Sequence, residues 1–437
     1  MNKYYYNKLG INTNTKRFKR YYQANLLNNI DETFVAEVKD YWKKYYNKDI
    51  NPALHISFMN LTGRKELRVI PEKEMWSEII PFFNDQSMTI GYKDKNIYDI
   101  LFNTRQSAKT VLKRVRSNYF DCNNNSLDVR QAYQLLLSSK SDLIIKPSDS
   151  NNGIGIDKIE IRDNAIYINK NQLNMSELEN NYGFNFIIQE IIGQHPIMAE
   201  PHPSSVNTLR MVTLRWKNEI HYLLTFARFG AHDDVKDNAG AGGVCLGVND
   251  SGKFMDVAID ENGFTHSHHP TTNYRFANLG EIENFEEFIT YVKQLHKDVL
   301  HHDFVSWDIA IDINGKPIFI EANFAGATWL YQLATQRPLF GELTDEIIQQ
   351  ISKEVKNRKR DISSLFVNKR KQNQKLNKRN KNLKNKKQEL QIMLTNKEDE
   401  LNQVKQQYEN VINSKTWKYT LPVRKVLKKI NNIIKRS

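Results

Sequence analysis

Two carboxylates and one amide between residues 308 and 323 have the spacing of a magnesium site. Asp308 lies in one apolar run and Glu321 ends another, and the Asn-Gly pair at 314–315 stands between the two runs. This pattern predicts a hairpin that pairs the two strands, and Asn323 should share the face of Glu321. Such an all-oxygen set suits Mg²⁺ that carries nucleotide phosphates. The alternative, an outward polar face, is disfavoured because unpaired carboxylates are costly among apolar neighbours.

A lysine at the end of another apolar run could bind phosphates. Lys146 ends the run that starts at Leu143, and a loop of Ser, Asp, Asn and Gly follows it. A fixed cation and backbone N–H donors from a loop without bulky side chains can hold an anion. The loop lacks the pattern of a Walker A motif, and taken alone it is also compatible with an ordinary hairpin. Its candidate phosphate-binding residues are Ser148, Ser150, Gly153 and Gly155.

Three further segments carry candidate binding residues. Asn207 and Arg210 stand three apart at the entry of a strand, and arginine is the residue suited to bidentate recognition of phosphate or carboxylate. Asp237 and Asn238 open a glycine-rich polar loop between strands. The third segment runs from a strand into a turn and contains Gln189, Glu190 and His195.

The elements that must position these residues follow from β-branched and aromatic runs. Interleaved strands and helices with several hairpins predict an α+β fold. Strands are expected at 143–145, 159–168, 186–189, 209–215, 220–229, 254–259, 307–312 and 317–321. Helices are expected near 31–47, 127–138 and 283–300, and residues 1–30 are expected to be a peripheral helix or poorly ordered.

Several classes of protein are disfavoured by what the sequence contains. The two cysteines, Cys122 and Cys245, can form neither a disulfide framework nor a Cys-based zinc site, which favours a reducing compartment. The eleven histidines include no HExxH motif, and no GxSxG elbow supports a hydrolase triad. The N-terminal residues lack the apolar stretch of a signal peptide, and no run is long enough to span a membrane.

The net charge of +13 is unevenly distributed. Residues 351–437 hold 25 Lys+Arg and 7 Asp+Glu, a net of +18. Subtraction from the totals of 63 and 50 leaves 38 and 43 in residues 1–350, a net of −5. The basic excess therefore lies in the tail, and nothing in the charge of residues 1–350 favours nucleic-acid binding.

The tail divides into a polar heptad region and a basic amphipathic end. Leucines at 376, 383 and 390 lie seven apart, and apolar residues continue the a/d seam to Val411. Asn380 and Lys387 weaken this seam, so an oligomeric coiled coil through 376–411 and a single solvated helix both remain open. In the last segment, residues 423, 426, 427, 430, 433 and 434 form one apolar face opposite Lys and Arg. Residues 417–437 could thus lie on an anionic membrane or cap the coil.

Taken in order, these motifs resemble the ATP-grasp superfamily, and most closely its sugar-transfer-associated branch of bacterial polysaccharide biosynthesis. The resemblance covers about 300 residues. It runs through Tyr41-Trp42, Asp94-Lys95, Lys146 and its loop, Gln189-Glu190, His195, Ser205 to Arg210, Asp237-Asn238, Gly242-Gly243, His269-Pro270, Trp307-Asp308 and Glu321-Ala-Asn323. A short C-terminal segment, Ser414 to Arg424, is similar to one that follows coiled coils in bacterial glycosyltransferases.

The resemblance implies a role for each motif. Two α+β subdomains would clasp ATP, with Lys95, Lys146 and the Ser148–Gly155 loop on the phosphates. Gln189 and Glu190 would hold the adenine, and His195 occupies the place where many members bind the ribose. Asp308, Glu321 and Asn323 would bind Mg²⁺. The catalytic set would be Arg210, Asn207, Asp237 and Asn238, with Arg210 and Asn207 on the γ-phosphate and the acyl phosphate.

The implied activity is that of an ATP- and Mg²⁺-dependent carboxylate–amine ligase. Its substrate would be a uronic acid or another sugar-linked carboxylate of a capsule or cell-surface polysaccharide. The alternatives are a sugar phosphotransferase and a non-catalytic nucleotide-binding scaffold of a glycan-assembly complex. We expect a cytoplasmic protein, peripheral to the inner face of the membrane, that binds ATP and a small amine and no nucleic acid. The expected segments are 1–50 (N-terminal helical), 51–140 (lid side), 141–345 (ATP-grasp core), 346–413 (coiled-coil-like helix) and 414–437 (amphipathic helix).

Overall fold

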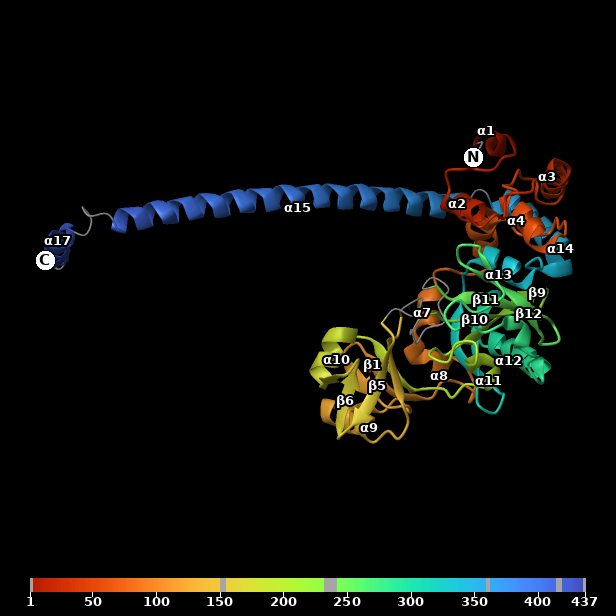
Figure 1. Ribbon diagram of the computed structural model, residues 1–437, viewed down its shortest axis with the longest axis horizontal. Helices are drawn as coiled ribbons and strands as arrows, with labels where there is room; N and C mark the ends of the chain where they lie inside the picture. The colour runs from red at the N-terminus through yellow and green to blue at the C-terminus, as the bar shows by residue number, and fades with distance from the viewer. Residues whose placement is uncertain (1–2, 150–154, 232–241, 359–361, 414–418, 435–437) are drawn as a thin grey trace. The chain divides into compact units, whose positions relative to one another are not determined.

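The chain folds into two compact units, Met1–Val355 and Lys356–Ser437. The computed structural model describes residues 3–149, 155–231, 242–358, 362–413 and 419–434 (Figure 1). The first unit contains two antiparallel β-sheets with helices, and the described part of the second is helical. The α+β class predicted from the sequence is therefore confirmed. The finer boundaries at 50 and 140 remain predictions.

The first sheet has eight strands in the order β3-β2-β1-β8-β4-β5-β6-β7, and each strand is antiparallel to its neighbours. Helices α9 (Val129–Leu137) and α10 (Met175–Tyr182) share its apolar core, and each begins with a capping box. The strands are β1 (Thr110–Val115), β2 (Asn118–Phe120), β3 (Ser126–Leu127), β4 (Leu143–Pro147), β5 (Asp157–Arg162), β6 (Ala165–Ile168), β7 (Asn171–Leu173) and β8 (Phe186–Glu190).

The second sheet has seven strands in the order β13-β12-β11-β10-β9-β14-β15, again antiparallel throughout. The predicted Asn-Gly hairpin is present: it joins β14 to β15, and Gly315 has φ +77°. The strands are β9 (Thr208–Trp216), β10 (Glu219–Phe229), β11 (Val244–Val248), β12 (Phe254–Asp260), β13 (Thr265–His266), β14 (Phe304–Ile311) and β15 (Pro317–Asn323).

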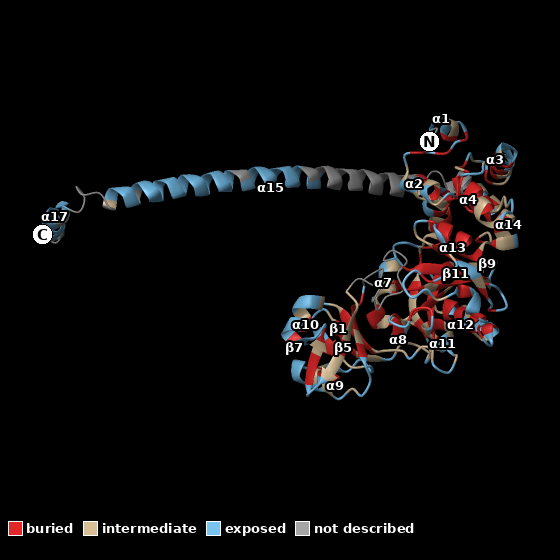
Figure 2. Ribbon diagram, viewed as in Figure 1, coloured by how far each residue is buried: buried red, intermediate tan, exposed pale blue. Residues whose placement is uncertain are grey.

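Both faces of the second sheet are covered, so its central strands β9, β11 and β14 are largely buried on both sides (Figure 2). Along β9 the side chains alternate between two cores: Met211 joins the core that includes α12 (Phe285–Lys297), and Val212 joins the core that includes α13 (Thr328–Thr335). A strand covered on both faces has few polar positions inside its core. Charged side chains that do occur there need partners.

A glycine within β11 is required for packing. A Cβ added to Gly247 on β11 would lie 2.4 Å from the carbonyl oxygen of Ala334 on α13 and 2.3 Å from the sulfur of Met255. The backbone of β11 therefore lies too close to α13 for any side chain. This glycine brings a helix onto the sheet.

The N-terminal helices complete the core on the α13 side. Phe18 and Tyr21 of α2 (Lys16–Gln23) are buried, and the ring of Tyr21 lies edge-on to Trp329 of α13 at 5.7 Å. Residues 3–30 thus include ordered helix that packs on the body, which agrees with the helical alternative of the two expected for residues 1–30. The other helices of this N-terminal segment are α1 (Lys3–Lys8), α3 (Glu32–Tyr46) and α4 (Ala53–Thr62).

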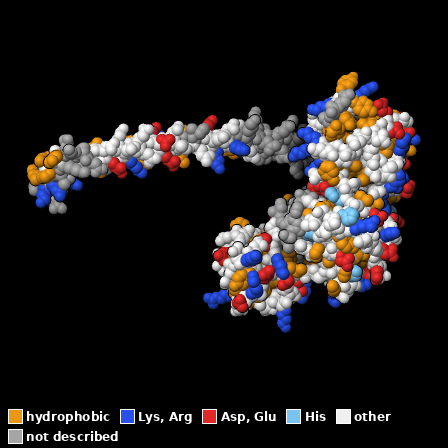
Figure 3. Space-filling view, in the orientation of Figure 1, with side chains coloured by type: hydrophobic (Ala, Val, Ile, Leu, Met, Phe, Trp, Pro, Cys, Tyr) orange, Lys and Arg blue, Asp and Glu red, His pale blue; other side chains and the backbone are white. Residues whose placement is uncertain are grey.

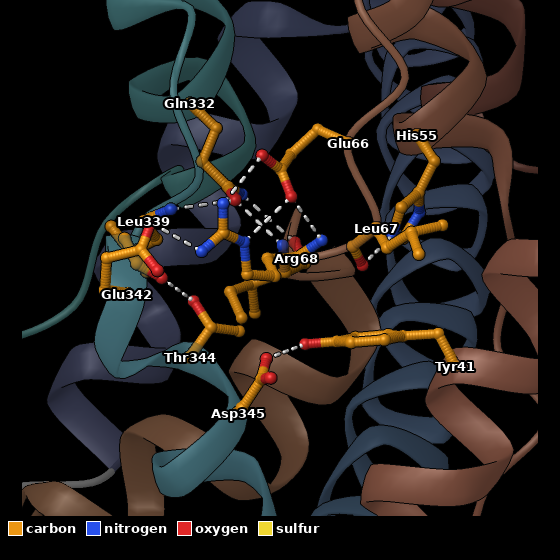
Figure 4. Close-up of polar contacts among 12 residues, drawn as sticks. Tyr41, His55, Glu66, Leu67, Arg68, Gln332, Leu339, Glu342, Thr344 and Asp345 are labelled. Carbon is orange, nitrogen blue, oxygen red and sulfur yellow. Dashed lines mark hydrogen bonds and ion pairs between the residues drawn. The ribbon is translucent and has the colours of Figure 1, made fainter.

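A polar junction ties the segment after α4 to the chain that follows the second sheet (Figure 4). The amide oxygen of Gln332 accepts hydrogen bonds from the backbone N–H of Ile70 at 2.8 Å and of Leu339 at 3.1 Å. Arg68 pairs with Glu66 and with Glu342. The buried Gln332 bonds thereby fix this segment to α13, and the Arg68–Glu342 pair adds a solvent-exposed contact just before α14 (Thr344–Arg358).

The remaining short helices of the first unit lie in the connections. They are α5 (Glu72–Glu74), η1 (Met75–Ile79), α6 (Ile80–Phe83), α7 (Thr89–Lys93), η2 (Lys95–Ile97), α8 (Tyr98–Leu101), α11 (Pro196–Ala199), η4 (Phe276–Asn278) and η5 (Gly341–Leu343).

The described part of the second unit comprises the last residues of α14, then α15 (Ile362–Asn413) and α17 (Leu421–Ile434). The heptad region predicted at 376–411 lies within α15, and the amphipathic end corresponds to α17. Figure 3 shows hydrophobic and basic side chains together at the end of the chain where α17 lies. Among the described residues, no helix combines the length and the apolar character needed to cross a bilayer.

Candidate active site

Three adjacent strands bring the main candidate residues into one row. Asp308 on β14 is the direct register partner of Glu321 on β15 and of Arg210 on β9. Directly opposed residues of antiparallel strands have neighbouring side chains on the same face. These three residues lie on the face of the sheet that α13 covers, where Tyr331 reaches Arg210.

Asp308 is the centre of this cluster. Its carboxylate accepts hydrogen bonds from Nε of Arg210 at 2.5 Å, from Nη2 of Arg210 at 2.9 Å and from Nη1 of Arg228 at 3.1 Å. The amide nitrogen of Asn323 donates a fourth bond at 3.2 Å. Burial alone would raise the pKa of Asp308, but the two guanidinium groups hold that pKa below its ordinary value. Asp308 is therefore an ionised, buried carboxylate at neutral pH.

Arg228 and Tyr331 belong to this cluster but were not predicted from the sequence. Arg228 lies on β10, and the hydroxyl of Tyr331 accepts a hydrogen bond from Nη1 of Arg210 at 3.0 Å. The signal for Arg228 was present, since it interrupts an apolar strand as Arg210 does. Tyr331 has no such signal. Gly326 makes its contact possible, because a Cβ there would lie 1.9 Å from the Tyr331 hydroxyl.

Two lysines from other elements lie near the second carboxylate, Glu321, and one of them pairs with it. Nζ of Lys95 on η2 lies 3.3 Å from Oε1 of Glu321, and both charges of this pair are largely removed from solvent. Lys146 at the end of β4 is buried as well. Its burial, reinforced by the nearby charge of Lys95 and opposed by Glu321, lowers the pKa of Lys146 to about 8. The phosphate-binding lysines expected from the sequence thus lie beside the expected magnesium ligand.

The end of β4 is tied to the segment that carries Lys95. The backbone N–H of Lys95 donates to the carbonyl oxygen of Ser148 at 2.9 Å. The Ser148 hydroxyl is buried and has no hydrogen-bond partner among the described residues. At Gly155, with φ +74°, a Cβ would lie 3.0 Å from the ring of Pro147, so the chain returns closely over the strand end. The candidates Ser150 and Gly153 lie outside the described residues.

The predicted adenine-binding residues lie on β8, between β1 and β4. The Gln189 amide nitrogen donates to the carbonyl oxygen of Ala108 at 3.1 Å, while its buried amide oxygen has no partner within the described chain. Glu190 pairs with Lys109 at 2.8 Å. The backbone N–H after it, at Ile191, already donates to Asp142. The Gln189 oxygen is thus a buried acceptor available to a ligand.

His195 and Asn207 are both engaged in holding the backbone. The ring of His195 accepts a hydrogen bond from the N–H of Ile197 at 3.3 Å and so caps α11. The Asn207 amide donates to the carbonyl oxygens of Met198 and His202, both at 2.7 Å, and its oxygen accepts from Ser205. A direct phosphate contact by Asn207 would require these bonds to break. The candidates Asp237 and Asn238 lie outside the described residues.

The oxygen set of Asp308, Glu321 and Asn323 fits Mg²⁺ only together with a phosphate ligand. No group of three or more His, Cys, Asp and Glu residues suited to a metal occurs in the described ranges, and this site supplies two carboxylates and one amide. Mg²⁺ is commonly held by one or two carboxylates, with phosphate and water completing the shell. Both carboxylates here are paired with cations, which phosphate oxygens could take over.

A comparison with protein families finds one match across most of this unit. A family model described as "Sugar-transfer associated ATP-grasp" matches residues 74–348, which is more than half of the chain and includes Lys95, Lys146, Arg210, Asp308 and Glu321. The matched segment begins after the N-terminal helices and ends within α14. No curated protein matches the chain.

Comparison with solved structures finds distant similarity to ligases. An L-amino acid ligase from Bacillus licheniformis is 11% identical, with 60% of this chain and 48% of that chain covered and a TM-score of 0.32. The VanG D-Ala:D-Ser ligase from Enterococcus faecalis is 12% identical over 61% and 63% of the two chains, with a TM-score of 0.36. The D-alanine–D-alanine ligase from Helicobacter pylori is 10% identical over 61% of each chain, with a TM-score of 0.34. This chain spans about half to just under two thirds of the length of these proteins.

Proposed function

The chain belongs to the sugar-transfer associated ATP-grasp family, and we propose that it is an ATP- and Mg²⁺-dependent ligase that joins a carboxylate to an amine. The observation that carries the proposal is the buried row of opposite charges. Arg210, Arg228, Lys95 and Lys146 give four cations around Asp308 and Glu321, a net of +2 when Lys146 is protonated. A cluster with this excess suits a polyphosphate, whose oxygens accept hydrogen bonds from guanidinium and ammonium groups.

Nucleotide binding in this proposal is an exchange of partners. Arginine and lysine side chains that now neutralise Asp308 and Glu321 turn to the phosphates. The two carboxylates, with Asn323, would then be free to hold Mg²⁺, whose charge would stabilise negative charge on the transferred phosphoryl group. Each carboxylate is paired with a cation before the exchange and would face Mg²⁺ after it, so neither is left as an isolated buried ion, which would be costly.

The remaining candidates have supporting places in the proposed site. The buried oxygen of Gln189 would accept from the adenine amino group, with Glu190 and His195 near the nucleoside, and Ser148, Ser150, Gly153 and Gly155 would contact the phosphates. Arg210 and Arg228 would hold the phosphoryl group. Asn207 would position the entry of β9, and Asp237 and Asn238 would complete the catalytic set.

The proposed reaction proceeds in two steps. An oxygen of the substrate carboxylate bonds to the γ-phosphorus as the bond to ADP breaks, which gives an acyl phosphate. The amine nitrogen then bonds to the acyl carbon, inorganic phosphate leaves, and the nitrogen loses a proton to give an amide. Catalysis would rest on positioning and charge stabilisation by Arg210 and Arg228 rather than on a covalent enzyme intermediate.

The proposed substrate is a uronic acid or another sugar-linked carboxylate used in capsule or cell-surface polysaccharide synthesis, with a small amine as acceptor. The name of the family supports a sugar setting. The apolar and basic faces of α17 support peripheral contact with an anionic membrane at the cytoplasmic side. The apolar a and d positions of α15 within residues 376–411 support self-association.

The test is ADP release with a panel of UDP-uronates and small amines, followed by mass spectrometry of the product. The expected result is ADP formation that requires both substrates and stops in the Asp308→Asn variant. Asp303→Asn is the matched control, because it breaks the Arg215–Asp303 pair at the far end of the same two strands. Wild-type turnover by Asp308→Asn would overturn the proposal.

A second measurement identifies the type of product. Hydroxylamine should trap an acyl phosphate as a hydroxamate, whereas a sugar phosphotransferase would give a phosphate ester that hydroxylamine leaves intact. Tight Mg²⁺-ATP binding without turnover on the whole panel would point to the scaffold alternative.

A further inference from the structure

The long helix α15 presents an apolar seam to solvent. Six aliphatic residues in heptad positions have 50–60% of their surface exposed: Leu383, Leu390, Leu394, Leu401, Val404 and Val411. With Leu383 and Leu390 at d, Leu394 and Leu401 occupy a, and Val404 and Val411 return to d. A stripe of this length buries its side chains when it meets the same stripe of another helix.

The charges of α15 are divided between its two halves. Residues 362–388 contain ten Lys+Arg and no Asp or Glu, whereas residues 389–413 contain two Lys and five Asp+Glu, a net of −3. A single solvated helix is usually stabilised by acid–base pairs three or four residues apart. The first half has no acid to form such pairs. In the second half Lys397 pairs with Glu400 at 2.5 Å.

The seam also contains polar residues whose placement depends on strand direction. Lys387 occupies an a position and Lys397 a d position. In a parallel, in-register pair each of these lysines would face its own copy in the core, where like charges are destabilising. The basic first half of each helix would likewise run alongside the basic first half of its partner.

We propose that α15 forms an antiparallel two-stranded coiled coil with a second copy of this chain. In the register that pairs Leu394 of one copy with Leu383 of the other, Lys387 lies against Leu390, and Lys397 lies against Asn380. The basic half of each helix meets the acidic half of its partner. On the flank of the seam, g positions then pair Arg379 with Glu400 across the interface, twice by symmetry.

The direction of the coil can be tested by cross-linking of the full chain. In a Cys122→Ser background, which removes the exposed native cysteine, Leu383→Cys and Leu394→Cys are prepared as separate proteins. Mixing and oxidation should link the two proteins to each other, and neither should link efficiently to itself. Efficient self-linkage of Leu394→Cys would show a parallel pair and overturn the proposal.

Charge reversal gives an independent measurement of the same register. Arg379→Glu should raise the dimer dissociation constant, measured by sedimentation equilibrium, by about tenfold, and adding Glu400→Arg should restore it. In a parallel pair Arg379 would lie beside Lys384 of the partner, so Arg379→Glu would remove a repulsion and lower the dissociation constant. Asp399→Lys is the matched control for Glu400→Arg, since position 399 lies on the outer face of the helix. A monomer at all concentrations would overturn the proposal whatever the activity of the ATP site.

Discussion

Arg210 donates two hydrogen bonds to Asp308 across adjacent strands, from Nε to Oδ1 at 2.5 Å and from Nη2 to Oδ2 at 2.9 Å. The two residues are direct register partners of β9 and β14, so the backbone pairing itself places them together. A planar guanidinium matches a carboxylate in this two-bond arrangement, which a lysine cannot reproduce. A planar group held in this way has little orientational freedom left to lose when a phosphate replaces the carboxylate.

We expect Arg210→Lys to lower kcat for ADP formation by about 10²-fold, because the charge remains but the fork that orients a phosphate is lost. The matched control is Arg215→Lys on the same strand, where Arg215 bonds to Asp303 and to two backbone carbonyl groups. This control should lose stability without an equal loss of kcat in the folded protein. Equal effects on kcat would show that Arg210 acts only in folding.

Tyr331→Phe should lower kcat by about tenfold with a loss of about 1 kcal/mol in stability, since one hydrogen bond to Arg210 is removed. Gly326→Ala should have a larger effect, because the new Cβ would displace the hydroxyl and the ring carbon that bears it. In the Tyr331→Phe, Gly326→Ala double variant the loss caused by Gly326→Ala should be smaller, because the hydroxyl that clashes with the new Cβ is absent. Kinetics and urea unfolding of the three variants measure this coupling. Fully additive losses would contradict the role given to Gly326.

Lys146 should make nucleotide affinity depend on pH. Burial lowers the pKa of Lys146 to about 8 from an ordinary value of 10.5, so the side chain loses its charge as pH rises through 8. ATP binding should weaken between pH 7 and pH 9, and binding near pH 8 should take up protons, because a phosphate raises this pKa. Calorimetry in buffers of different ionisation enthalpy measures the uptake. Lys146→Met should abolish the uptake, and an unchanged proton uptake in that variant would assign it elsewhere.

The lowered pKa of Lys146 makes the stability of the fold rise with pH, whereas nucleotide binding should weaken. Between pH 8 and pH 10.5 the unfolded chain binds more protons at this residue than the folded chain, so its contribution to stability rises with pH. Below pH 8 the buried charge is destabilising throughout. Lys146→Met should therefore be more stable than the wild-type protein at pH 7, by about 1–3 kcal/mol, while binding nucleotide less well. A stability loss at pH 7 would contradict this account.

Strand pairing explains why part of the site could be predicted from the sequence. Asp308 and Glu321 lie on the two strands that the Asn-Gly turn joins, and the structure pairs them as expected. The turn alone does not set this pairing, because an irregularity between Asp308 and Ile309 shifts the register by one residue. The run at 159–168 shows the limit of this approach. It is a hairpin of β5 and β6 that turns at Asp163 and Asn164, both with positive φ, where the sequence analysis expected one strand.

Local sequence patterns did not predict contacts between elements that are far apart in the chain. Tyr331 reaches Arg210 from a helix 121 residues away, and Gly326 matters only because of that approach. Strand β11 was missed because its sequence, Val-Cys-Leu-Gly-Val, contains a glycine that a strand interior disfavours. That glycine is explained only by the packing of α13 on the sheet. Tertiary packing decided each of these cases.

The attachment of the N-terminal segment can be tested at Gln332. Gln332→Leu should lower the free energy of unfolding by about 3 kcal/mol, because the buried N–H and C=O of Ile70 and the N–H of Leu339 lose their partner. Urea unfolding measures the loss. Gln350→Leu on α14 is the control, since Gln350 is exposed and its amide bonds only to Glu354 among the described contacts. Similar losses in both variants would contradict a specific role for the junction.

The terminal helix gives a prediction that is independent of catalysis. Val423, Val426, Leu427 and Ile430 of α17 are all about half exposed, and residues 415–437 carry eight Lys+Arg and no Asp or Glu. The full chain should co-sediment with liposomes that contain anionic lipid at low salt and should remain in solution with neutral liposomes, because both the apolar face and the charge are needed.

Leu427→Asp should abolish binding at any salt, since it places a charge in the apolar face. Lys428→Glu with Lys429→Glu should weaken binding at low salt and reduce its salt dependence. Both changes lie outside the first unit, so ADP formation should be unaltered in both variants. Equal sedimentation of wild type and Leu427→Asp would show that α17 is not the membrane contact.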